Sequence, residues 1–179
     1  MLLGISIFLG CAAAVFAMIA LHECGHFFAG MAAGIPADQM KIRLLVFPQH
    51  VALRDGEDWL SPTDYHRYVS RSQAILKGRK GLIAYVSGGL LVETATFIGF
   101  VWMCRALDMP YLWQVPLTSA LASLPMTYLV ADILASGRAR HPCGDFSGLW
   151  KISRPSAALV TAVVIISHAG LLWYVLQNA

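Results

Sequence analysis

Four long apolar runs constrain this chain of 179 residues more than any other feature. The first covers about residues 3–35, and the others cover about 81–104, 111–131 and 155–177. Each reaches the roughly 20 residues that an α-helix needs to cross the hydrocarbon of a bilayer. Together they occupy more than half of the chain, so we expect an all-α multi-pass membrane protein with a single membrane-embedded domain, 1–179.

Composition and charge support this interpretation and exclude some partners. Hydrophobic residues make up 58% of the chain and charged residues 13%, with a formal net charge of +3. The 13 basic residues are spread along the loops, which excludes nucleic acid as a partner. All but Arg105 fall on one side of the four expected spans, and the positive-inside rule makes that side cytoplasmic. We expect an integral protein of a bacterial inner membrane, with both termini outside and the lipid bilayer as its surroundings.

The polar loop 36–80 separates the first two spans. Residues 40–44 alternate between apolar and polar side chains, and residues 51–53 precede a turn, which predicts a small β-hairpin on the cytoplasmic side. Ser61 is expected to cap an interfacial helix that runs to about residue 76. This loop therefore predicts a small layer of structure outside the hydrocarbon.

The motif that carries chemistry is HExxH, formed by His22, Glu23 and His26 with Cys24 and Gly25 between them. Two histidines four residues apart lie on one face of a helix and can bind one Zn²⁺, while the glutamate can act as a general base. Ionisable residues inside a membrane span are costly and usually mark function. The alternative is a polar cluster that only bonds to neighbouring helices. Cys24 points away from the histidines and is not expected to be a ligand.

A zinc hydrolase normally has three protein ligands, so a third His, Asp or Glu is needed. Five residues inside or beside the spans are candidates: Glu93, Asp132, His141, Asp145 and His168. Asp132, His141 and Asp145 lie on the same side of the expected membrane as HExxH, which favours them. His168 lies about midway along the last span and is expected to be a core histidine.

The order of these features resembles the site-2 protease family of intramembrane zinc metalloproteases. HExxH ends the first span, a basic loop follows, and the small residues Ser87, Gly88 and Gly89 open the second span. The family has Ala-Gly-Pro followed by an Asn at the corresponding place. Here Gly89 replaces the proline, and Val92 or Glu93 stands where the Asn is expected.

The resemblance also implies the third ligand. The family uses the Asp of a Leu-Asp-Gly or Ser-Asp-Gly motif, preceded by Asn-x-x-Pro. In this chain Ser123 and Pro125 stand in the place of Asn-x-x-Pro. Asp145 with Gly148 resembles the Asp-Gly motif. We therefore expect Asp145 to be the third ligand, with Asp132 as the alternative. Substrate-binding or supporting roles are expected for five residues: Gly88, Gly89, Glu93, Ser123 and Pro125.

The function implied is hydrolysis of peptide bonds in or near transmembrane segments, with Zn²⁺ as the cofactor and Glu23 as the catalytic base. The partners would be a transmembrane protein substrate and an adaptor protein that helps to select it. The strand expected at residues 41–44 could pair with an unwound substrate. Two alternatives remain open from the sequence: a zinc-binding transporter or sensor without hydrolysis, and an inactive family member that binds client helices.

Overall fold

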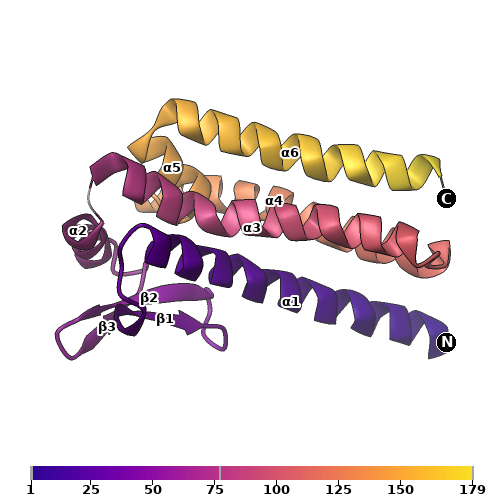
Figure 1. The fold of residues 1–179 in the computed structure, drawn as a ribbon, viewed down its shortest axis with the longest axis horizontal. Helices are drawn as coiled ribbons and strands as arrows, with labels where there is room; N and C mark the ends of the chain where they lie inside the picture. Colours follow the sequence, from indigo (N-terminus) through magenta and orange to yellow (C-terminus); the bar gives the residue numbers. More distant parts are fainter. Residues whose placement is uncertain (1, 77, 179) are drawn as a thin grey trace.

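Four long helices form the body of the protein (Figure 1). The structure is a computed structural model that describes residues 2–76 and 78–178. Among these residues, α1 (Leu2–Ala32), α3 (Gly78–Ala106), α4 (Tyr111–Ala139) and α6 (Arg154–Gln177) are each long and apolar enough to cross a membrane. Their number equals the number of spans that the sequence predicts. Both ends of the chain lie at the same end of the bundle (Figure 1).

The outer surface of these helices is strongly apolar. Large side chains such as Leu2, Phe8, Trp102, Ile133 and Ile166 are exposed along the bundle. Contiguous apolar surface of this kind is unfavourable in water and normally faces a partner or a membrane. The surface is therefore consistent with a multi-pass membrane protein.

The first helix ends three residues earlier than expected, at Ala32. Gly34 has a φ of +103°, and the Ile35 amide donates to Gly30 O at 2.9 Å while the Gly34 amide donates to Met31 O at 3.0 Å. This pair of bonds is a Schellman motif, which needs a residue in the left-handed region and so favours glycine. The sequence expectation of a span to residue 35 includes this cap.

The polar loop forms a three-stranded antiparallel sheet. Strands β1 (Met40–Arg43) and β2 (His50–Asp55) confirm the expected hairpin, and a short third strand, β3 (Asp58–Leu60), follows a turn at Gly56. Met40 lies opposite Leu53, and Ile42 opposite Val51. This register places apolar side chains on one face of the sheet, which packs against Ile35, Leu76 and Tyr85.

The loop contains a helix in the expected region, α2 (Tyr65–Ile75), but Ser61 does not cap it. The Ser61 hydroxyl instead accepts hydrogen bonds from the amide and hydroxyl of Thr63, at 3.3 and 2.9 Å. The residues from Ser61 to Asp64 form a turn, which delays the start of the helix to Tyr65. The sequence prediction of the helix start was wrong by this one turn.

The last two long helices are separated by a short helix that the sequence did not predict, α5 (Asp145–Ile152). The helix before it, α4, continues to Ala139 instead of ending near residue 131, so Asp132 lies inside it and is buried. Leu149 of α5 is fully buried against α3 and α6, in a cluster with Leu90 and Val164. This packing holds α5 against α3 and α6, near the end of the bundle where the sheet lies (Figure 1).

The helices α1 and α3 approach each other closely at two glycines. A Cβ on Gly25 would lie 2.5 Å from Gly88 O, and a Cβ on Gly88 would lie 2.5 Å from the Ala29 Cβ. Small residues at such a crossing let two backbones approach more closely than larger side chains allow. The crossing brings the face of α1 that carries HExxH directly against α3.

Candidate metal centre

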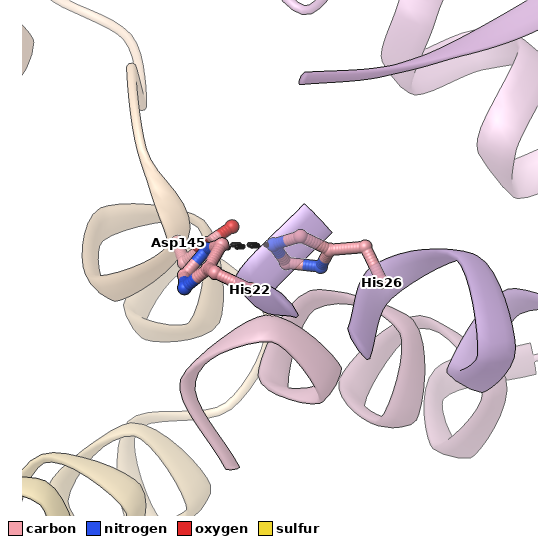
Figure 2. Close-up of side chains that lie close together, drawn as sticks. All are labelled: His22, His26 and Asp145. Atoms are coloured by element: carbon pink, nitrogen blue, oxygen red, sulfur yellow. Dashed lines mark hydrogen bonds and ion pairs between the residues drawn. The ribbon is translucent and has the colours of Figure 1, made fainter. Parts of the chain in front are cut away.

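Three side chains from two helices converge inside the bundle (Figure 2). His22 and His26 lie one turn apart on α1, and Asp145 is the first residue of α5. Asp145 Oδ2 is 2.9 Å from His22 Nε2 and 3.2 Å from His26 Nε2, and the two Nε2 atoms are 3.1 Å apart. The structure thus brings together the two HExxH histidines and the third residue that the family resemblance implies.

Each of the three side chains has its own outer hydrogen-bond partner. His22 Nδ1 lies 2.8 Å from Glu93 Oε2, and His26 Nδ1 lies 2.9 Å from Tyr85 O. Tyr128 donates its hydroxyl hydrogen to Asp145 Oδ2 at 3.2 Å. A carbonyl oxygen only accepts hydrogen bonds, so the hydrogen of neutral His26 is on Nδ1 and the lone pair is on Nε2. A carboxylate oxygen also only accepts, so a Glu93 carboxylate would select the same tautomer of His22. Partners that orient ligands in this way are typical of metal sites.

Asp145 is positioned by two side chains of α4 that hold the start of α5. The Tyr128 hydroxyl accepts a hydrogen bond from the Asp145 amide at 2.9 Å. Asp132 Oδ2 accepts from the Ser147 amide at 2.8 Å, and Oδ1 accepts from the Ser147 hydroxyl at 2.6 Å. First-turn amides of a helix have no partner within the helix, so these bonds stabilise its end. Asp132, the alternative third ligand, therefore caps α5 and is not a member of the converging group.

Two groups near the centre have displaced pKa values. Burial opposes ionisation of Asp145, but the neighbouring imidazoles of His26 and His22 outweigh it and hold the pKa of this carboxyl below its ordinary value. Burial, the adjoining Tyr85 hydroxyl and the charges of Glu23 and Asp145 raise the pKa of Tyr68 well above its ordinary value. Glu23 is buried and lies between the two histidines in the sequence. It is therefore close enough to Tyr68 of α2 for its charge to affect that hydroxyl.

Tyr68 and Tyr85 connect the sheet to the centre. Tyr68 donates its hydroxyl hydrogen to Val51 O of β2 at 2.8 Å, so the Tyr85 hydroxyl, 2.6 Å away, is the donor in the bond between the two tyrosines. The same Tyr85 provides the carbonyl that orients His26. The helix α2 and the strand β2 are in this way connected through Tyr85 to the histidines of the candidate site.

The space in front of the two histidines depends on Gly89. A Cβ built on Gly89 would meet His26 Nε2 and would lie 2.6 Å from His22 Nε2. Any larger residue would occupy the position that a metal ion bound by both nitrogens needs. The expectation that Gly88 and Gly89 support the site is consistent with this geometry, Gly88 by close helix packing and Gly89 by leaving room.

The donor set fits zinc. Two imidazole nitrogens and one carboxylate oxygen are ligands that Zn²⁺ binds, and catalytic zinc sites have three protein ligands plus one open position. Ligand atoms at about 2.0–2.1 Å from a tetrahedral zinc ion are about 3.3 Å from one another. The observed separations of 2.9, 3.1 and 3.2 Å need only small outward movements to match this value.

The other candidates lie elsewhere. The Ser123 side chain is exposed and donates to Ala120 O of its own helix, and Pro125 is buried within α4. His141 stacks on Tyr65 of α2 with ring centroids 4.5 Å apart. His168 is a core histidine, stacked on Phe97, as its position in the last span suggested.

Two residues of the site were missed by the sequence analysis. Tyr85 contributes through its backbone carbonyl, and because every residue has one, the residue type does not indicate this role. Tyr128 lies four residues before Asp132 on α4, so both point toward α5, but that spacing is informative only once α4 is known to continue past residue 131.

No family model, curated protein or solved structure matches this chain.

Proposed function

We propose that this protein is an intramembrane zinc metalloprotease of the site-2 protease type. The observation that carries the proposal is the convergence of His22, His26 and Asp145 within helices apolar enough to cross a membrane. Zinc bound by these three side chains would polarise a substrate carbonyl and make a bound water acidic enough, with a pKa of about 7, to supply a nucleophile. The order of motifs along the chain supports the same family.

Glu23 is the general base of this proposal. It is buried and adjacent to His22 on α1. A carboxylate there can accept a proton from the attacking water and then pass that proton to the leaving amine nitrogen, so no net proton remains on the enzyme after one peptide bond is hydrolysed. Glu93 and the Tyr85 carbonyl keep the two imidazoles in the ligand orientation, while Tyr128 does so for Asp145.

The proposed substrate is a transmembrane segment of another protein. A helix hides its carbonyls in internal hydrogen bonds, so the substrate has to unwind before attack. In the described sheet β1 is an edge strand, paired on one side with β2, and an extended substrate could add to its other side. The charge bias of the loops supports a position of this sheet on the cytoplasmic side of the membrane. The membrane in this proposal is the inner membrane of a bacterium.

The test uses the purified protein in liposomes together with a panel of single-span membrane proteins. Wild type is expected to cleave at least one of them, and Glu23→Gln is expected to keep its zinc but to cleave about 10²–10⁴-fold more slowly, the usual contribution of a general base. Glu57→Gln, a change at an exposed loop carboxylate, is the matched control and should cleave like wild type. Equal cleavage by Glu23→Gln and wild type would contradict the proposal.

A further inference from the structure

Four buried polar atoms in the bundle have no hydrogen-bond partner among the residues that the structure describes. They are Glu93 Oε1, Gln114 Nε2, Thr118 Oγ1 and His168 Nε2. All four side chains are at least nine-tenths buried, and they come from α3, α4 and α6. Only Glu93 also takes part in the metal centre, through its other oxygen.

Phe97 links two of these groups. It lies one turn after Glu93 on α3, and the His168 ring stacks on it with centroids 4.4 Å apart and an angle of 5° between the planes. Glu93 and His168 therefore border the same part of the bundle interior, next to the metal centre.

The two groups of α4 continue from this point along the bundle. Leu121 and Ala122 pack in one buried cluster with Phe97, and Thr118 lies one turn before them on α4. Gln114 lies one turn before Thr118, near the start of α4 at Tyr111. The polar groups thus follow the interior from the metal centre toward the α3–α4 connection, at the end of the bundle away from the sheet (Figure 1).

The chemistry of these atoms identifies what joins them. His168 Nδ1 donates to Val164 O at 2.9 Å, so Nε2 of the neutral ring is an acceptor, and a carboxylate oxygen such as Glu93 Oε1 is an acceptor as well. Two acceptors cannot bond to each other. Gln114 Nε2 is a donor, which is unsuitable for binding a cation, and Thr118 both donates and accepts. Water donates two hydrogen bonds and accepts two, so it can satisfy all four atoms.

We propose that Glu93, His168, Thr118 and Gln114 hold a chain of internal water molecules that leads from the α3–α4 end of the bundle to the metal centre. An unpaired polar group in an apolar interior is energetically unfavourable, and bound water removes this cost. The water chain itself is independent of the enzymatic activity. Its use as the supply of the water consumed in hydrolysis rests on the proposed function.

The experiment is hydroxyl-radical footprinting of the zinc-loaded protein in detergent, in which a short X-ray pulse forms radicals from water next to a side chain. Met18 packs against Phe97 and Leu121, Met40 packs in the separate sheet cluster, and both are 4% exposed. Because only Met18 would border internal water, we expect it to be oxidised at least about fivefold faster than Met40. Equal rates for the two methionines would overturn the water chain.

A double variant tests which side chains hold the water. Thr118→Val with His168→Phe removes two of the four unpaired polar atoms and puts apolar side chains of similar shape in their place, so the oxidation rate of Met18 should fall to that of Met40. Thr127→Val, at an exposed position of the same helix, is the control and should leave the rate unchanged. Zinc content and elution as a single species report folding, and Thr118→Val alone is used if the double variant fails these checks. An unchanged Met18 rate in the folded variant would overturn the assignment without affecting the protease proposal.

Discussion

The two sides of the candidate metal centre are built in different ways. On one side, His22 and His26 are placed by the pitch of a single helix, α1, and the Gly25–Gly88 crossing brings them against α3. On the other side, Asp145 comes from a short helix whose start is held by Tyr128 and Asp132 of α4.

The two sides depend on different kinds of contact, local helix geometry for the histidines and tertiary contacts for Asp145. The histidine pair is fixed by local geometry, because residues four apart on any α-helix lie on one face. The position of Asp145 requires contacts between residues that are 15 or 17 positions apart in the chain. We therefore expect changes on the α1–α3 side to block the metal site directly, and changes on the α4–α5 side to act by loosening Asp145.

The largest expected effect follows from filling the space in front of the histidines. Gly89→Ala places a Cβ against both Nε2 atoms, so we expect zinc affinity to fall by about 100-fold or more, beyond the 10–100-fold typical of losing an outer partner. The measurement is zinc competition with a chelator in detergent. Gly99→Ala is the matched control on the same helix, where a Cβ meets nothing within 4 Å, and it should bind zinc normally.

The next effect tests the α4–α5 side. Asp132→Ala removes the acceptor of the Ser147 amide and hydroxyl, so α5 should lose about 1 kcal/mol of capping stabilisation, and zinc affinity should fall about 10–100-fold as Asp145 becomes less well positioned. Thermal unfolding and chelator competition measure the two quantities. Unchanged zinc affinity would show that the position of Asp145 does not depend on this cap.

A smaller effect is expected at the outer partner of His22. Glu93→Gln keeps an oxygen that can accept from His22 Nδ1 but removes the negative charge, so zinc affinity should fall about tenfold. The competition assay reports this change. A fall as large as that of Gly89→Ala would mean that Glu93 does more than orient His22.

The smallest effect is expected at a position that the family resemblance singled out. Ser123→Ala removes only a hydroxyl that bonds to its own helix, so zinc affinity should stay within about twofold of wild type and stability within about 0.5 kcal/mol. Cleavage by this variant in the liposome assay should also match wild type. A strong loss of cleavage with zinc retained would place Ser123 in substrate binding after all.

The same comparison explains what the sequence can predict. Long apolar runs and HExxH depend on composition and short spacing, so the four spans and the histidine pair are readable from the chain alone. Asp145 is predicted as the third ligand only through the family resemblance, because its position in the chain does not distinguish it from Asp132. The α5 helix and the role of Tyr128 depend on tertiary contacts that no short pattern encodes, and β3 is too short to show an alternating pattern.

The metal content of the protein decides whether His22, His26 and Asp145 form one zinc site. It is measured by elemental analysis of the purified protein, wild type beside Glu23→Gln and Asp145→Ala. We expect about one zinc per chain in wild type and in Glu23→Gln, and a clear loss in Asp145→Ala, because a catalytic zinc site has three protein ligands. Wild type without zinc, or Asp145→Ala with full zinc, would contradict this expectation.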